Sequence, residues 1–292
     1  MRRGKAYLMV IAAAFLWGTI GLFVRNLAAD GLSNSQLIAF RAWVSAGIMV
    51  LWLALRSPGE LRIRLTDWWM FAGTGIVSFV LFGSCYFASL QRVPLSTAAV
   101  LLYTAPIFVA VLSTWLFHDP FTVRTAVALA MAFGGCVLVS GFSASADATG
   151  IILGLLSGFF YALYSIFGKY ALKRYSSMTV TTYTFIFASI GITPFCSFPQ
   201  LAALAWTPAM TVTLIIFAVA SGAAAYLLYT KGLSGLPATD AAIAAILEPV
   251  VATLAGLAVF HETLGLMSIL GIGLVLGAIL VLNLPGRRQK SA

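Results

Sequence analysis

The chain has 292 residues, of which 61% are hydrophobic and only 9% are charged, and its formal net charge is +9. Soluble domains have about 25% charged residues, so this composition, with a mean hydropathy of +1.02, excludes most soluble folds. It predicts an all-α polytopic membrane protein. The Lys and Arg residues lie beside the apolar segments rather than on one soluble face, so we expect no nucleic-acid partner.

Ten apolar runs are long enough to cross about 30 Å of hydrocarbon, which takes roughly 20 helical residues. The first follows Arg2, Arg3 and Lys5, as in a secretory signal, but it is long enough to span, and we expect it to be retained as a helix. In chain order the expected spans lie near residues 6–26, 34–55, 67–90, 95–116, 123–142, 149–171, 178–199, 208–231, 237–260 and 264–284.

The distribution of positive charge predicts the orientation of these spans. With a cytoplasmic N-terminus, fourteen Lys and Arg residues lie on the cytoplasmic side and three on the other. Cytoplasmic loops are enriched in Lys and Arg, so we expect both termini to be cytoplasmic. All loops are short, which leaves no room for a soluble domain.

A long internal repeat organises the chain. The stretch Pro237–Glu262 repeats the pattern of Pro94–Asp119, 143 residues earlier, without a gap. Pro106 therefore matches Pro249. The two stretches end in Phe-His-Asp and Phe-His-Glu. The two His-acid pairs would lie on opposite membrane faces and so could not form one acid–base or metal site. We therefore interpret them as turns.

The first helix of each half also corresponds. FLWGTIGLFVR from Phe15 matches FFYALYSIFGK from Phe159, which pairs Trp17 with Tyr161. Five spans separate the two copies, so the second half must enter the membrane with opposite polarity. We therefore predict two inverted five-helix repeats, residues 1–146 and 147–292, that form one membrane unit, an architecture of many secondary transporters.

With these motifs, the chain resembles the drug/metabolite transporter superfamily, specifically its EamA-type ten-helix exporters. The resemblance is carried by AAFLWG at Ala13–Gly18, the proline pairs of both repeats, LEPV at Leu247–Val250 and FHE at Phe260–Glu262. It covers nearly the whole chain and is nearest to the aromatic amino-acid exporter branch. One mild departure is the His in the acidic turn, where the family commonly has Gly.

The resemblance implies efflux of small organic metabolites, often amino acids, across the bacterial inner membrane. It also implies that the first, third, fourth, sixth, eighth and ninth helices surround a central cavity. The expected partners are a small-molecule substrate and membrane lipid. We expect no cofactor or metal, and a monomer is the working expectation for the oligomeric state.

Glu248 is an acid inside an apolar span, where a charge costs at least about 2.5 kcal/mol. Its neighbours three and four residues away include Ala245 and Ala252, and Ala241 lies seven residues away on the same helical face, so Glu248 should face protein or a cavity. It could titrate a proton, accept a substrate ammonium, or have a structural role beside Pro249, whose ring leaves a backbone carbonyl without its helical donor. The first repeat has Ala at the matching position, Ala105.

Pro106 and Pro249 should kink their helices at matched positions. Such kinks could act as hinges for alternate opening of the two sides, or they could be static bends that shape the cavity.

Aromatic residues divide by their expected depth. Trp17, Tyr103, Tyr161 and Tyr164 lie near span centres, where a buried hydroxyl or indole needs a polar partner, so we predict that they line the cavity, with helix packing as the alternative. Tyr86 is a further cavity candidate near the outer mouth.

Three other polar residues are expected at span ends. Tyr226 and Tyr229 are expected in the interfacial aromatic belt. Arg41, one or two turns inside the second helix, is expected to extend its side chain to the membrane surface.

These observations predict a non-enzymatic exporter that works by alternating access around an apolar, aromatic-lined cavity, with amino acids that carry aromatic or apolar side chains as substrates. The alternative is a proton-driven efflux pump for lipophilic cations that uses Glu248. A membrane enzyme would need a cluster of His, Asp or Cys on one face, which the sequence lacks. The repeat gives no reason to expect a receptor or scaffold.

Overall fold

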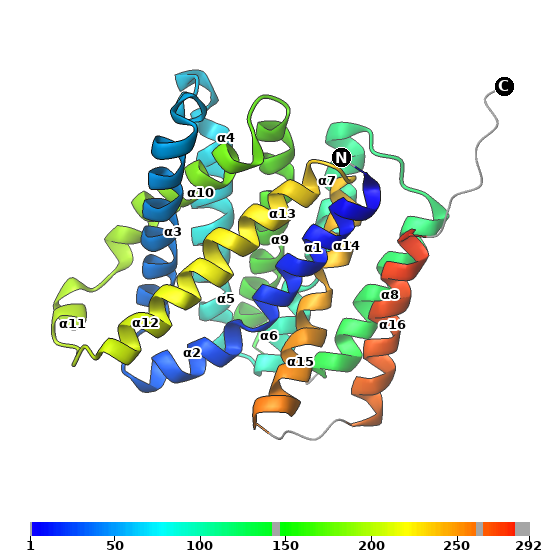
Figure 1. Ribbon diagram of the computed structural model, residues 1–292. Coiled ribbons are helices and arrows are strands. Elements are labelled where there is room, and N and C mark those ends of the chain that lie inside the picture. Colours follow the sequence, from blue (N-terminus) through cyan, green and yellow to red (C-terminus); the bar gives the residue numbers. More distant parts are fainter. Residues whose placement is uncertain (1, 142–146, 261–264, 284–292) are drawn as a thin grey trace.

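The computed structural model describes residues 2–141, 147–260 and 265–283, in which every regular element is a helix (Figure 1). Ten helical segments of this part are long and apolar enough to cross a membrane, which confirms the predicted number of spans. They are Arg3–Ala29, Asn34–Arg56, Leu65–Leu90, Leu95–Phe117, Val123–Ser140, Ala148–Leu172, Ser177–Phe195, Pro208–Leu233, Ala238–Val259 and Leu266–Asn283.

Four of the spans are each a single α-helix, and the seventh is one α-helix with a short 3-10 turn at its end. These five helices are α3 (Asn34–Arg56), α8 (Val123–Ser140), α9 (Ala148–Leu172), α10 (Ser177–Ile192) and α16 (Leu266–Asn283). Polar side chains cap several of their N-termini; Ser33, for example, forms a reciprocal capping box with Gln36.

The other five spans are interrupted. The first consists of α1 (Arg3–Gly18) and α2 (Ile20–Ala29), and the fourth of α6 (Leu95–Leu102) and α7 (Ala105–Phe117). The ninth consists of α14 (Ala238–Ala245) and α15 (Leu247–Phe260). The third contains α4 (Trp68–Ala72), η3 (Gly73–Val80) and α5 (Leu81–Leu90), and the eighth α12 (Pro208–Phe217), η5 (Ala218–Ala224) and α13 (Ala225–Leu233).

The interruptions fall at corresponding places in the two halves. Helix α6 ends at Leu102 and α14 ends at Ala245, 143 residues later, the same spacing as in the sequence repeat. The next helix in each case carries the matched proline, Pro106 or Pro249, in its first turn. Because proline lacks the N–H that would extend the preceding helix, the break lies just before it.

The segments η3 and η5 are both π-helical and lie in the third span of their half. A π-turn widens the helix and is frequent at functional sites. The glycine Gly75 within η3 lies so close to α10 that an added Cβ would be 2.4 Å from the carbonyl oxygen of Thr184 and 2.7 Å from the amide nitrogen of Ala188.

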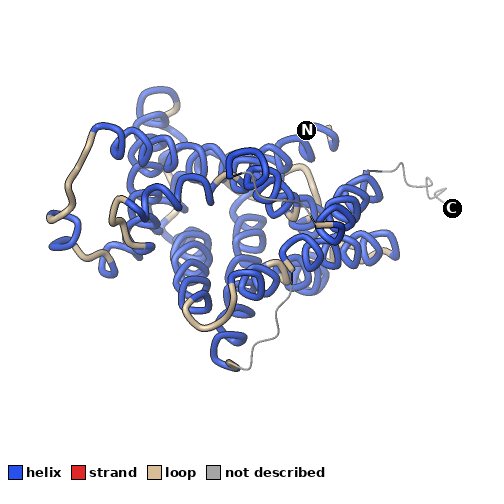
Figure 2. Tube along the Cα trace, turned by 90° about the horizontal axis from the view of Figure 1, so that it is seen from below, coloured by secondary structure: helices blue, strands red, loops and turns tan. Residues whose placement is uncertain are grey.

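Helices of one half pack mainly against helices of the other. Helix α3 contacts α10, α7 contacts α14, and α8 contacts α16. Helix α1 packs against α13, α14 and α15, whereas α9 packs against α5, α6 and α7. In Figure 1 α1 runs downward, whereas α9 and α16 run upward. Figure 2 shows the same bundle from below, with many helices seen near end-on.

Large apolar side chains cover the outside of the bundle. Leu8, Leu55, Trp115, Leu266 and Leu280 each expose 66 to 74% of their surface. Such a surface is unfavourable in water and favourable against lipid tails. Small residues and hydroxyl-bearing residues are buried at many positions inside the bundle, such as Ala13, Ala162 and Ser165.

Candidate functional site

A small cavity lies at the centre of the bundle, where the first, fourth, sixth, eighth and ninth spans meet. Its free volume is about 20 Å³, room for about one water molecule. Its wall is largely aromatic on one side and small on the other. The lining residues are Trp17, Ala105, Pro106, Val109, Tyr161, Ala162, Tyr164, Ser165, Tyr226, Tyr229, Ala242 and Ala245.

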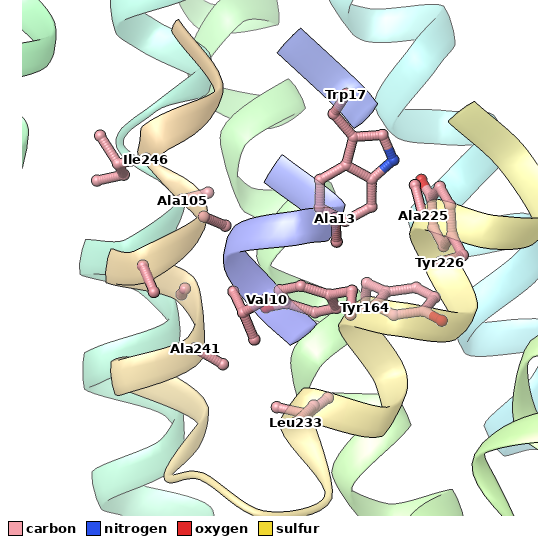
Figure 3. Close-up of a cluster of buried hydrophobic side chains, with 14 of the residues drawn as sticks. Val10, Ala13, Trp17, Ala105, Tyr164, Ala225, Tyr226, Leu233, Ala241 and Ile246 are labelled. Atoms are coloured by element: carbon pink, nitrogen blue, oxygen red, sulfur yellow. The ribbon is translucent and has the colours of Figure 1, made fainter. Parts of the chain in front are cut away.

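Trp17, near the end of α1, is the centre of the aromatic wall. Its ring centroid lies 6.3 Å from that of Tyr161, 5.2 Å from that of Tyr226 and 5.4 Å from that of Tyr229. Its indole Nε1 donates a hydrogen bond of 3.1 Å to the carbonyl oxygen of Ser221, which belongs to the π-helical η5. Figure 3 shows the indole beside Tyr226, with its nitrogen turned toward the helical span that carries Tyr226.

The tyrosines on the lower part of this wall have polar partners. The hydroxyl of Tyr164 lies 2.6 Å from Oγ1 of Thr230, and the hydroxyl of Tyr229 lies 2.7 Å from Oγ of Ser165. A buried phenol needs such a partner, so these bonds hold α9 and α13 in register. The ring of Tyr164 also packs at 5.1 Å from that of Tyr226.

A second row of aromatic rings leads away from the cavity along the third span. The ring of Tyr161 lies 5.2 Å from that of Phe82, and Phe82 lies 6.2 Å from Tyr86. Tyr86 therefore does not line the small cavity. The ring of Phe82 lies between it and Tyr161, which does. Tyr103, at the break between α6 and α7, is almost fully buried.

Glu248 lies in the first turn of α15, just after the break between α14 and α15. The Tyr103 hydroxyl is placed to hydrogen-bond with its carboxyl group, and Arg41 is the positive charge that acts on it. Tyr86 and Tyr161 interact with Glu248 electrostatically as well. Four of the predicted residues, Trp17, Pro106, Tyr161 and Tyr164, line the small cavity itself. Glu248 interacts with Tyr161 of its wall and with Tyr103 and Arg41. We call the small cavity, together with Glu248, Tyr103 and Arg41 beside it, the central chamber.

The break in each helix pair packs against a glycine of the opposite half. A Cβ at Gly18 would lie 2.8 Å from the carbonyl oxygen of Glu248, and a Cβ at Gly158 would lie 2.8 Å from that of Leu101. These two glycines let α1 approach the start of α15 and let α9 approach the end of α6. The proline breaks therefore lie at helix crossings, in contact with the spans that carry Trp17 and Tyr161.

Two predictions about depth are wrong. Tyr226 and Tyr229 are buried, with 3% and 4% of their surface exposed, and both line the central cavity instead of a membrane interface. Arg41 does not extend to the membrane surface: its guanidinium carbon lies 5.1 Å from the ring centroid of Phe79 and 5.3 Å from that of Tyr226. One sequence signal could have indicated the inward direction of Arg41. Ser45 follows four residues later, on the same helical face, and polar residues on one face of a span favour a face turned toward protein. In the structure Ser45 bonds to Ala218 of η5.

Polar contacts join the start of α1 and the end of α9 to the ninth span and to the corner before it. Asp240, in the first turn of α14, accepts hydrogen bonds from Arg3 at 2.8 Å and from the Tyr7 hydroxyl at 2.9 Å. Lys169 donates to the carbonyl oxygen of Leu236 at the corner between α13 and α14. Asp240 therefore does more than cap a helix, because it joins the start of α1 to the ninth span. The second acidic turn, at residues 261–262, lies outside the described residues.

Comparison with known proteins identifies the class to which this bundle belongs. The EamA-like transporter family matches the chain twice, over residues 4–141 and 148–284. The chain belongs to this family, and it is a multi-pass membrane transporter rather than an enzyme. A solved crystal structure with a TM-score of 0.83 has the same fold at 17% sequence identity, with 99% of both chains covered.

Three curated relatives are also transporters by name. An uncharacterized transporter of Archaeoglobus fulgidus is 31% identical over 283 residues, which covers 96% of each chain. The uncharacterized transporter YwfM of Bacillus subtilis is 28% identical, with 99% of this chain and 98% of YwfM covered. The pseudopaline exporter CntI of Pseudomonas aeruginosa is 25% identical over 189 residues, or 64% of each chain.

Proposed function

We propose that this transporter exports amino acids with aromatic or apolar side chains across the bacterial inner membrane. The observation that carries the proposal is the wall of Trp17, Tyr161, Tyr164, Tyr226 and Tyr229 around the central chamber. Aromatic and apolar side chains are the usual lining of small-molecule sites. Such a wall favours a flat apolar side chain and offers little to sugars.

The size of the small cavity in this conformation supports alternating access. About 20 Å³ is far too small for an amino acid, since small-molecule pockets usually have about 300–1,000 Å³. The chamber must therefore enlarge when substrate enters. The matched breaks before Pro106 and Pro249 are our proposed hinges, because each has a gap in helical hydrogen bonding at which the two helix segments can change their angle.

The proposed mechanism uses two inverted repeats, residues 1–146 and 147–292, with both termini in the cytoplasm. Support comes from the family's two matches along the chain, from the matched helix breaks and from the exchange of contacts between halves. In such a pair, the arrangement adopted by one half in the inward-open state is adopted by the other half in the outward-open state. The contacts of Asp240 with Arg3 and Tyr7 would then separate when the cytoplasmic side opens.

Counterflow into proteoliposomes tests the substrate proposal. We expect vesicles loaded with unlabelled L-Phe to accumulate labelled L-Phe, L-Trp and L-Met, while protein-free vesicles accumulate none. Labelled L-Asp should not exchange, because the aromatic wall offers no partner for a second carboxylate. If no amino acid of the panel exchanges, the substrate proposal is wrong.

Glu248 is the group that we assign to the substrate ammonium. It lies on the ninth span just after the break between α14 and α15, and it interacts with Tyr103 and with Tyr161 of the cavity wall. A hydrogen bond to a charged group is worth about 1.5–3 kcal/mol, so Glu248→Gln should lower the rate of L-Phe counterflow at least about tenfold. A counterflow rate equal to that of the wild type would remove Glu248 from substrate binding.

A proton-driven pump for lipophilic cations is the second candidate, because an acid among aromatic rings also suits an apolar cation. The same Glu248→Gln protein separates the two. The exporter proposal expects no uptake of tetraphenylphosphonium by wild-type proteoliposomes under an imposed pH gradient. Uptake that is driven by the gradient and lost in Glu248→Gln would favour the pump.

A further inference from the structure

The side chain of Arg41 is the charged group of the chamber that sequence reasoning did not place there. It lies seven residues inside α3, which begins at Asn34, or about 10 Å along the helix axis. An ionised group at such a depth is costly and is usually functional in membrane proteins. The contacts of its guanidinium indicate what it can bind.

Two aromatic rings hold the guanidinium in place. Phe79, in the π-helical η3, and Tyr226, just after the π-helical η5, have ring centroids 5.1 and 5.3 Å from the guanidinium carbon. Rings at these distances attract the cation through their π faces. The Tyr226 hydroxyl also interacts with Arg41 through a hydrogen bond. The guanidinium has five N–H donors, so further donors remain for a ligand.

The stem of Arg41 fits into η5 at a glycine. A Cβ at Gly222 would lie 3.2 Å from Cγ of Arg41 and 2.2 Å from Oγ of Ser45. Ser45 in turn donates a hydrogen bond of 3.1 Å to the carbonyl oxygen of Ala218 at the start of η5. The widened helix thus fixes both the stem of the arginine and the direction of its head.

The guanidinium has unused hydrogen-bonding capacity. Its Nε is buried and has no hydrogen-bond partner among the described residues. A buried donor without a protein partner is costly, so this N–H is available to a bound ligand. Arg41 and Glu248 interact electrostatically, yet across residues 2–141, 147–260 and 265–283 neither belongs to an ion pair.

We infer that Arg41 binds the carboxylate of the substrate, so that Arg41 and Glu248 together recognise the two charged ends of a zwitterionic α-amino acid while the aromatic wall takes its side chain. This inference rests on the proposed function and adds to it a requirement for a free carboxylate. A guanidinium suits this task, because its planar fork can donate two parallel hydrogen bonds to a carboxylate. Bound substrate would also supply the acceptor that Nε lacks.

Three probes separate the charged ends of the substrate: L-Phe, 2-phenylethylamine, which has no carboxylate, and 3-phenylpropionate, which has no ammonium. Each competes with labelled L-Phe for counterflow in proteoliposomes. For wild type, we expect 2-phenylethylamine to compete at least about tenfold more weakly than L-Phe, because a charged hydrogen bond is lost. L-Phenylalaninamide should be as weak as the amine.

The variant Arg41→Gln should bind L-Phe no better than 2-phenylethylamine, while Arg41→Lys should keep part of the preference for L-Phe. Arg56→Gln is the matched control, because Arg56 lies at the other end of α3 over the exposed ring of Trp52. It should behave as wild type. If Arg41 only stabilises the bundle through its rings, Arg41→Gln will unfold at a lower temperature but keep the wild-type preference for L-Phe, which would overturn the inference.

The wild-type panel keeps the inference testable if Arg41→Gln does not fold. Equal competition by L-Phe and L-phenylalaninamide in wild type would overturn it, whereas weak competition by the amide together with a reduced preference in Arg41→Lys would support it. If wild type exchanges no amino acid, 3-phenylpropionate is tested in direct binding. If wild type binds 3-phenylpropionate and both Arg41→Lys and Arg41→Gln lose that binding, the carboxylate site is supported although the amino-acid proposal fails. If wild type does not bind 3-phenylpropionate, both the carboxylate site and the amino-acid proposal are overturned.

Discussion

Replacing Trp17 with alanine should lower L-Phe counterflow at least about tenfold, since truncating a Trp at the centre of a binding site costs about 2 kcal/mol or more of binding free energy. The indole contacts three tyrosines of the chamber and donates a hydrogen bond to Ser221. Its loss removes both the largest surface of the aromatic wall and the bond that joins α1 to η5. Trp17→Phe keeps a ring but not the donor, so we expect an intermediate rate.

Trp115→Ala is the control for this experiment. Trp115 lies on α7 with 73% of its surface exposed, on the outside of the bundle. Its removal should change counterflow by less than about twofold, because lipid replaces the lost contacts. Rates are compared per folded protein, measured by size-exclusion chromatography in detergent. Equal losses in Trp17→Ala and Trp115→Ala would show that the effect of Trp17 is not specific to the chamber.

Replacing Gly75 with alanine should strongly destabilise the bundle. The added methyl group would lie 2.4 and 2.7 Å from two backbone atoms of α10, at Thr184 and Ala188, so η3 and α10 must separate. Overpacking of this kind costs about 1–3 kcal/mol or more. In a thermal unfolding experiment in detergent we expect the midpoint to fall by about 5 °C or more.

Gly134 and Gly47 provide controls for Gly75, because a Cβ at either would meet nothing within 4 Å. Alanine there should leave the unfolding midpoint unchanged or raise it, since Ala is favoured over Gly in a helix by about 1 kcal/mol. A Gly75→Ala protein that unfolds at the wild-type temperature would contradict the close packing of η3 against α10.

Hydropathy alone located the spans well, because the length of an apolar run reports directly on whether a helix can cross a bilayer. The depth of a residue along a span was harder to obtain. Tyr226 and Tyr229 were counted as close to a span end, but they follow the π-helical η5. A π-turn has about one extra residue per turn, so it rotates the following helix and changes which of its side chains face inward. The hydrophobic periodicity of the sequence does not predict a π-turn.

The position of Arg41 could not be derived from α3 alone. A long side chain near a span end can reach the membrane surface or turn inward, and an isolated helix favours the surface. Its inward direction depends on Phe79 and Tyr226, which come from two other spans, and on the space left at Gly222. By contrast, Trp17 and Tyr161 could be paired in advance, because the repeat aligns them.

The exchange of first helices between the halves has a consequence for biosynthesis. Helix α1 contacts α13, α14 and α15, so its partners are made only after more than two thirds of the chain has left the ribosome. The contact of Arg3 with Asp240 spans 237 positions. Until those helices are made, the inner face of α1, which carries Trp17, has no protein partner from the second half and contacts lipid or the insertion machinery. Neither five-helix fragment should therefore assemble alone, whereas two fragments made in the same cell should complement each other.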